Sequence, residues 1–147
     1  MKVFAKNKKA FFDYEILETF ETGVQLTGTE VKSIKDSRVS LKEAFVKVIG
    51  NEVFLVNSHV PEYLQGNRNN HVPTRSRKLL MRRKQIDRLI GKIKEAGLTL
   101  VPLKIYQKDR LIKLEIALAK GKKTHDKRQV LKERDLQREM GRELKIK

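Results

Sequence analysis

The side chains of this chain that are best suited to chemistry are cations, and they occur in clusters. Residues 75–84 contain six basic side chains and no acidic one. Such a row of positive charge matches the phosphate backbone of a nucleic acid. Arg82, Arg83 and Lys84 also stand at the start of an expected helix, where the helix macrodipole disfavours cations. This unfavourable placement favours phosphate binding over the alternative of a solvated basic loop.

Other basic clusters lie near the two ends of the apolar part of the chain. Asn7, Lys8 and Lys9 precede the first expected strand, and Gly121-Lys-Lys123 and Lys127-Arg128 follow the last one. His125 stands between the last two groups in a segment without a core, so we expect its imidazole to be free to stack on a base.

No catalytic or metal-binding pattern accompanies these cations. The sequence has no cysteine, no glycine-rich phosphate loop and no Ser-His-Asp motif. His59 and His71 are interpreted as ordinary polar loop residues. Asp13 and Glu15 would point to opposite faces of a strand. We therefore expect a binding protein that is not an enzyme, with no catalytic residue, no cofactor and no metal.

The overall charge indicates the same class of partner. The 147 residues include 34 Lys and Arg against 18 Asp and Glu, which gives a net charge of +16. Such an excess destabilises the compact state by self-repulsion and suits nucleic acid or, alternatively, an anionic membrane surface. The sequence contains neither a signal-peptide pattern nor an apolar run of about 20 residues. We expect a cytoplasmic protein without a membrane partner.

The elements that position these cations are predicted within residues 1–119. Short β-rich runs, with a turn at Thr22-Gly23, predict about six strands, at residues 14–20, 24–27, 45–49, 52–56, 99–106 and 111–118. Gly50-Asn51 has the turn chemistry of a tight hairpin. Pro102 predicts a bulge or an edge, because it lacks the N–H that a ladder needs.

Helices are expected at two places among the strands. The segment 28–36 is a short helix candidate capped by Thr29, and the segment 82–96 carries one apolar stripe that Gly97 ends. Ser40 and Glu43 have capping-box spacing, which predicts at least a helical turn. Because closure removes exposed strand edges, we predict a mainly β fold: a small closed antiparallel β-barrel with short helices.

Residues 120–147 form a separate basic tail in this prediction. They carry a net charge of about +6 and few apolar side chains. Leu136, Met140 and Leu144 make one thin stripe, and pairs worth about 0.2–0.5 kcal/mol each cannot secure a lone helix. We expect the tail to be disordered when free and helical when bound. The alternative is a surface helix that packs on the body.

Four motifs in this order and spacing resemble the SmpB family of bacterial SsrA-binding proteins. They are Asn7-Lys-Lys-Ala10, Gly28-Thr-Glu-Val-Lys-Ser33, Arg75-x-Arg-Lys-Leu-Leu80 and Ala117-x-Ala-Lys-Gly-Lys-Lys-x-His-Asp-Lys-Arg128. The resemblance implies an OB-fold barrel that binds the tRNA-like domain of transfer-messenger RNA and delivers it to stalled ribosomes. There the RNA supports trans-translation, peptide tagging and ribosome rescue.

The resemblance also implies roles for individual positions. Glu21 is expected to accept hydrogen bonds from bases or sugars, and Leu80 to stack or pack. The RNA-binding positions implied on the body are Asn7, Lys8, Lys9, Glu21, Lys32, Arg75, Arg77, Lys78 and Leu80. The tail positions implied at the small-subunit decoding centre are Lys122, Lys123, His125, Asp126, Lys127 and Arg128, with the downstream helix in the empty messenger channel.

Two other functions compete with this interpretation. One is a ribosomal structural protein with a basic barrel and a tail buried in ribosomal RNA. The other is a nuclease, which the lack of an acidic metal-binding cluster disfavours. A rescue factor is expected to be a monomer present on few ribosomes, whereas a structural protein is present on every ribosome.

Overall fold

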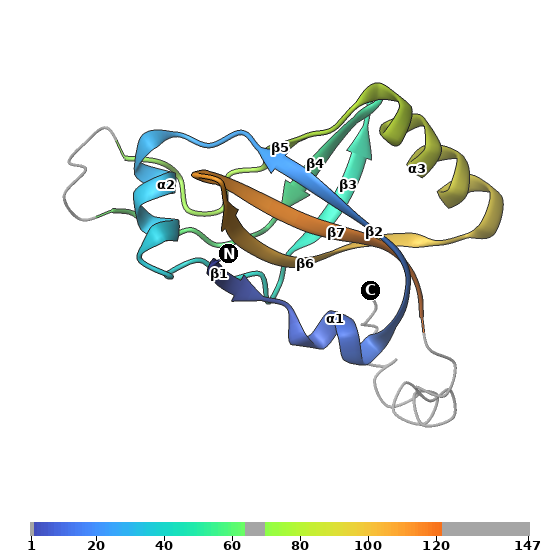
Figure 1. The fold of residues 1–147 in the computed structure, drawn as a ribbon, viewed down its shortest axis with the longest axis horizontal. Helices are drawn as coiled ribbons and strands as arrows, with labels where there is room; N and C mark the ends of the chain where they lie inside the picture. The colour runs from blue at the N-terminus through green and yellow to red at the C-terminus, as the bar shows by residue number, and fades with distance from the viewer. Residues whose placement is uncertain (1, 64–69, 122–147) are drawn as a thin grey trace, which may run out of the picture.

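The computed structural model describes residues 2–63 and 70–121, which form one antiparallel sheet and the helices that flank it (Figure 1). The strands are β1 (Lys2–Lys6), β2 (Tyr14–Val24), β3 (Phe45–Ile49), β4 (Glu52–Val56), β5 (Arg77–Leu80), β6 (Thr99–Lys108) and β7 (Leu111–Gly121). The helices are α1 (Lys8–Asp13), α2 (Gly28–Lys35) and α3 (Arg83–Ala96).

The seven strands pair in the order β1-β6-β7-β2-β5-β4-β3. All pairs are antiparallel, so the mainly β prediction is confirmed, with seven strands instead of about six. β1 and β3 are edge strands that do not pair with each other, so the sheet is not closed by hydrogen bonds as the barrel prediction required. β3 nevertheless contacts β6, which brings the two ends of the sheet near each other.

One hairpin forms at Gly50-Asn51 as predicted, and a second joins the two strands that were predicted at residues 99–106 and 111–118. β3 pairs with β4 from Phe45–Val56 to Ile49–Glu52, and Gly50 and Asn51 both have positive φ, as a tight turn of this type needs. β6 pairs with β7 around Asp109 and Arg110, which also have positive φ. The β6–β7 ladder shifts register between Pro102 and Lys104, which confirms the expected bulge.

The core lies between the sheet and the helices. Ile34 of α2 and Ile86 and Leu89 of α3 are buried in the same apolar cluster as Leu114 and Ile116 of β7. Ile90 and Ile93 pack partly against this cluster, so the predicted apolar stripe of α3 faces the core. Gly97 ends α3 in the left-handed conformation, where it donates to the carbonyl of Ile93, as predicted.

Several local predictions were wrong. β2 runs without interruption through the expected turn at Thr22-Gly23, because Thr22 is buried and its hydroxyl donates to the carbonyl of Leu114 at 3.0 Å. The N-cap of α2 is Thr27, not Thr29, since Thr27 and Glu30 form a reciprocal capping box. Ser40 begins only a tight turn, in which Ala44 N–H bonds to the carbonyl of Leu41.

β1, α1 and β5 were not predicted as elements. β1 pairs with β6 about a hundred residues away, and β5 pairs with both β2 and β4. No helix in the described part of the chain is both long enough and apolar enough to cross a membrane.

Candidate nucleic-acid interface

Glu21 lies on the solvent face of the central sheet, in a cluster supplied by three strands. The Tyr106 hydroxyl of β6 donates to Glu21 Oε2 at 2.5 Å, and Lys108 Nζ donates to Oε1 at 3.3 Å. The Tyr106 hydrogen bond lowers the pKa of Glu21 below 4.5, with further help from Lys108 and Lys113. Burial and the Glu21 bond raise the pKa of Tyr106 above 10. The carboxylate therefore stays ionised as an acceptor, and the phenol keeps its proton.

Leu80 lies on the same face as Glu21. Gly23 of β2 is opposite Leu80 of β5 and also opposite Lys113 of β7, and directly paired residues share one face. A side chain at Gly23 would press on its neighbour, because an added Cβ would lie 3.3 Å from the Leu80 Cβ, a contact that Leu80 could relieve only by shifting a few tenths of an ångström. Leu80 is half exposed, so an apolar side chain stands beside an acceptor and a cation. Lys113 was not predicted as a site residue from the sequence. Its pairing with Gly23 in the β2–β7 ladder places it on this face.

Glu30 links two of the sequence motifs through a buried ionic network. Its side chain is fully buried at the start of α2 and receives bonds from both Arg75 and Arg77. Arg75 Nη2 lies 2.7 Å from Oε1, and Arg77 Nη2 lies 2.9 Å from Oε2. Burial alone would raise the pKa of Glu30, but the bonds from Arg75 and the Thr27 N–H and the two guanidinium charges lower it to about 2.

The two arginines of this network have different surroundings. Arg75 is partly exposed and also donates to the carbonyl of Gln25. Arg77 is 1% exposed, and its guanidinium donates to Glu30, to the Ser58 hydroxyl at 3.1 Å and to the carbonyls of Pro73 and Arg75. As placed, Arg77 is buried with its guanidinium bonded inside the protein, and its RNA contact stays a prediction. Its physical role is to join β5 to α2.

Lys32 and Lys78 lie outside this network and reach solvent. Lys32 of α2 is exposed, and its ammonium group lies 5.7 Å from the centre of the Tyr63 ring. Lys78 of β5 forms an exposed ion pair with Glu52 at 3.0 Å. An exposed pair of this kind contributes at most about 1 kcal/mol.

His71 lies in the loop as interpreted from the sequence, but it is buried there. Its Nε2 lies 2.8 Å from the carbonyl of Val60, and its Nδ1 lies 2.8 Å from the Thr29 hydroxyl. Because a carbonyl can only accept, Nε2 carries a proton. His71 thereby fixes the segment before Arg75 to α2. His59 is exposed, and its backbone pairs with that of Ser40.

Asn7 is buried beneath the two lysines that follow it. Its Nδ2 donates to the carbonyl of Pro102 at 2.9 Å, and its Oδ1 accepts from the Ala10 N–H as the N-cap of α1. Its backbone N–H donates to the carbonyl of Leu103 at 2.7 Å. With one bond at each polar end, Asn7 positions the exposed Lys8 and Lys9, and its own RNA contact stays a prediction. The sequence predicted the cluster but not this division of roles.

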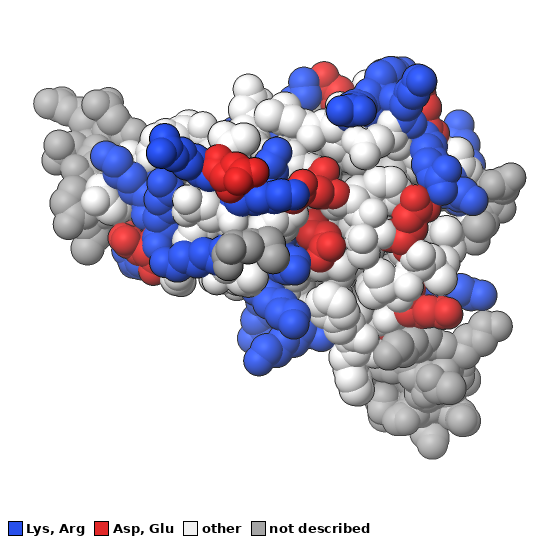
Figure 2. Space-filling model, in the orientation of Figure 1, with Lys and Arg blue, Asp and Glu red and all other residues white. Residues whose placement is uncertain are grey.

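Lysine and arginine side chains gather over several parts of the visible face, while acidic side chains lie near its centre (Figure 2). In this orientation the cations lie over α2, over α3 and beside β1 (Figures 1 and 2). Within residues 2–63 and 70–121, no group of His, Asp and Glu side chains could hold a metal ion. The predicted tail contacts at Lys122, Lys123, His125, Asp126, Lys127 and Arg128 lie outside the described residues. β7 includes Lys120 and ends at Gly121.

Residues 4–146 match the family model described as SmpB protein. The chain belongs to the SmpB family. It is 53% identical over 146 residues to the SsrA-binding protein of Thermosipho africanus, covering 99% of this chain and 98% of that one. It is 57% identical over 146 residues to the SsrA-binding protein of Halalkalibacterium halodurans, covering 99% of this chain and 95% of that one.

A solved structure agrees with this family membership. One of its chains superposes with a TM-score of 0.68 at 42% identity, covering 90% of this chain and 94% of that one. That structure is described as "tmRNA-SmpB: a journey to the center of the bacterial ribosome". For an SmpB-family chain, the described residues supply an exposed set at Lys8, Lys9, Glu21, Lys32 and Leu80 and a buried set at Asn7 and Arg77 that holds it in place.

Proposed function

We propose that this protein binds transfer-messenger RNA through its tRNA-like domain and delivers it to stalled ribosomes for trans-translation, peptide tagging and ribosome rescue. The observation that carries the proposal is the match to SsrA-binding relatives over nearly the whole chain. The net charge of +16 supports an RNA partner. The reaction needs no chemistry from the protein, which acts as a monomeric binding factor in the cytoplasm.

The described residues divide RNA recognition between two kinds of contact. Lys8, Lys9 and Lys32 are exposed cations that suit phosphates, and they set the position of the RNA. Glu21 and Leu80 suit bases or sugars, because a carboxylate accepts hydrogen bonds from their donors and an apolar side chain packs on a base or ribose. Arg75 and Lys78 carry additional positive charge beside them, although both have acidic partners in the free protein.

We further propose that residues 1–119 act as an OB-like barrel and residues 120–147 as a tail that probes the ribosome. The near approach of β3 to β6 supports a strongly curved sheet, although its edge strands do not pair. The composition of the tail supports a segment that becomes helical on an anionic surface. Its basic residues would occupy the decoding centre, and the helix would enter an empty messenger channel.

The experiment that tests the function is to isolate this protein from cells by an affinity tag and to sequence the RNA bound to it. We expect one dominant RNA with a tRNA-like end. A spread of ribosomal RNA fragments, with the protein present on every ribosome, would instead identify a structural component of the ribosome.

A further inference from the structure

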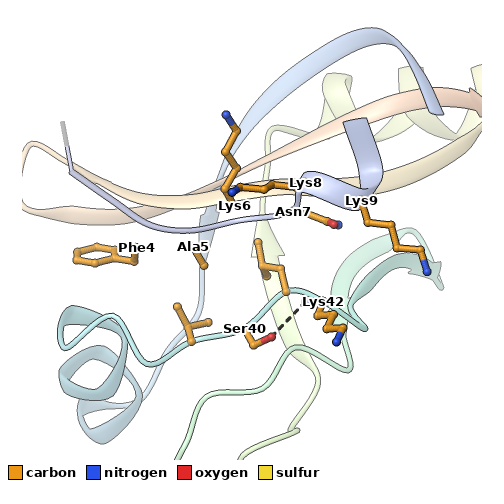
Figure 3. A pocket seen from close by; sticks show the side chains of 10 residues that line it. Phe4, Ala5, Lys6, Asn7, Lys8, Lys9, Ser40 and Lys42 are labelled. Atoms are coloured by element: carbon orange, nitrogen blue, oxygen red, sulfur yellow. Dashed lines mark hydrogen bonds between the residues drawn. The ribbon is translucent and has the colours of Figure 1, made fainter. Parts of the chain in front are cut away.

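The edge strands β1 and β3 do not pair, and we call the opening between residues 4–9 and residues 39–42 the seam. Lysines line both of its sides, and no single sequence motif includes all of them. One cavity, of about 390 Å³, lies between β1 with Asn7, Lys8 and Lys9 on one side and residues 39–42 on the other (Figure 3). A neighbouring cavity, of about 250 Å³, continues past α1 to the start of β3 and β6. Lys9 and Lys42 line both cavities, so they lie at the junction from opposite sides of the seam.

Lys42 stands on a turn that the fold holds firmly. Val39 and Leu41 beside it are buried in the core, and Ser40 exchanges two backbone hydrogen bonds with His59 at 2.8 and 3.0 Å. The Ser40 hydroxyl accepts from the Lys42 N–H at 3.3 Å, and the Ala44 N–H donates to the carbonyl of Leu41. The opposite wall is held by Asn7, whose side chain and backbone bond to β6. Both walls are therefore fixed before any ligand binds.

The charges of the seam are unbalanced. No ion pair within the described part of the chain involves Lys6, Lys8, Lys9 or Lys42. The first cavity has four lysines and no acid in its lining. Two acids stand beside these lysines: Asp13, which lines the second cavity, and Glu43, which follows Lys42 and is exposed. A fixed concave site whose lining holds more cations than acids concentrates positive potential and suits a polyanion.

We propose that the seam is a phosphate-binding groove for the backbone of the tRNA-like domain, and that Lys42 completes it from the wall opposite Lys9. Figure 3 shows Lys9 on one wall and Lys42 on the facing turn, both toward the same end of the cavity, so a sugar-phosphate backbone that crosses the seam there meets both ammonium groups. The motif Asn7-Lys8-Lys9 supplies one wall only. The proposal rests on the proposed function and adds Lys42 and the seam to the RNA-binding surface.

The test is a salt titration of the affinity of the full-length chain for the transcribed tRNA-like domain. Lys42→Gln removes one charge and keeps a side chain of similar shape. Loss of one phosphate contact lowers the slope of log K against log salt by about 0.7–0.9, which corresponds to about fivefold weaker binding near 0.15 M salt. Lys94→Gln is the matched control, because Lys94 is exposed on α3, away from the seam (Figure 1). We expect that control to leave both affinity and slope unchanged.

The outcomes separate this proposal from the function on which it rests. Wild-type affinity and slope in Lys42→Gln, with its circular dichroism spectrum unchanged, would overturn the groove while leaving tmRNA binding intact. Unchanged tmRNA binding with weaker binding to ribosomes would also overturn it and would assign the seam to ribosomal RNA. If the wild-type chain showed no preference for the tRNA-like domain over unrelated RNA hairpins, the proposed function itself would fail.

Discussion

Arg77→Met removes one of the two fully buried charges of the Glu30 network and leaves an unbranched apolar side chain in its place. Glu30 then keeps Arg75 as a partner but loses the bond at 2.9 Å from the only other guanidinium in its network. Ser58 and the carbonyl of Pro73 lose their donor as well. The effect is expected on the stability of the fold before any effect on RNA.

The size of that effect follows from burial. Breaking a buried ion pair by removing one partner typically costs about 3–5 kcal/mol, because the remaining charge stays desolvated. Domains of this size have a total free energy of unfolding of about 5–15 kcal/mol. With a urea m-value of about 2 kcal/mol per M, the unfolding midpoint should fall by about 1.5–2.5 M.

The assay is urea unfolding at pH 7 followed by circular dichroism, with Arg88→Met as the matched control. Arg88 pairs with Glu18 at 3.0 Å, but both side chains are exposed, at 53% and 36%. An exposed pair contributes no more than about 1 kcal/mol, so the control midpoint should shift by less than about 0.5 M. Each variant removes an arginine from an ion pair, and the two pairs have nearly the same contact distance. They differ in how deeply the pair is buried.

The pH dependence gives a second, independent measure of the same network. The pKa of Glu30 is about 2 in the fold, below its ordinary value of 4.5. A lowered pKa means that the contribution is complete above about pH 5 and is lost as the pH falls towards 2. The difference corresponds to about 3 kcal/mol. We therefore expect Glu30→Gln to be less stable than the wild type at pH 7 and to approach it near pH 2.

One result would refute this reasoning. If Arg77→Met kept the wild-type urea midpoint while its salt slope for tmRNA fell by about one, Arg77 would be a phosphate contact and not a link between β5 and α2. That outcome would support the RNA contact that the sequence predicts for Arg77.

Three other variants test the remaining parts of the site. Tyr106→Phe removes the 2.5 Å hydrogen bond to Glu21, so the pKa of Glu21 should rise towards 4.5. As the pH falls, tmRNA binding should then be lost at a higher pH than in the wild type. NMR titration of the Glu21 carboxyl and affinity measurements between pH 4 and 7 follow the two effects. Asn7→Ala should cost about 1–2 kcal/mol in thermal unfolding through the lost cap and weaken tmRNA binding with an unchanged salt slope, because both lysines remain; a lower slope would contradict a positioning role. Deleting residues 122–147 should preserve affinity for the tRNA-like domain and abolish tagging on stalled ribosomes, and loss of RNA affinity in that truncation would contradict the division between body and tail.

The parts of the fold that the sequence predicted well are those decided by neighbours in the chain. The β3–β4 hairpin follows from two β-rich runs around Gly50-Asn51, and α3 follows from its apolar stripe and Gly97. β1 and β5 were missed because they are only five and four residues long, they mix basic with apolar side chains, and their partners lie far along the chain. The alternation of β5 is also inverted, since Arg77 faces the core and Leu80 is half exposed.

The same distinction explains the site. Residue type and motif identified Lys8, Lys9 and Lys32, which the structure leaves exposed. They could not show that Asn7 and Arg77 are buried, because that depends on the carbonyl of Pro102 and on Glu30, which lie far away in sequence. One local signal was available: Thr27 and Glu30 have the spacing of a capping box, which places Glu30 in the first turn of α2.

Two motifs that look separate in the sequence are therefore one structure. Glu30 of Gly28-Thr-Glu-Val-Lys-Ser33 holds Arg75 and Arg77 of Arg75-x-Arg-Lys-Leu-Leu80. The guanidinium of Arg77 donates to a carboxylate, a hydroxyl and carbonyls at the same time. A lysine cannot replace it, because a lysine lacks this planar set of donors. The buried members fix α2 against β5, the two elements that carry Lys32 and Lys78. The basic residues of these motifs thus have two roles. Those that are buried stabilise the packing of α2 on β5, and those that are exposed remain free to bind.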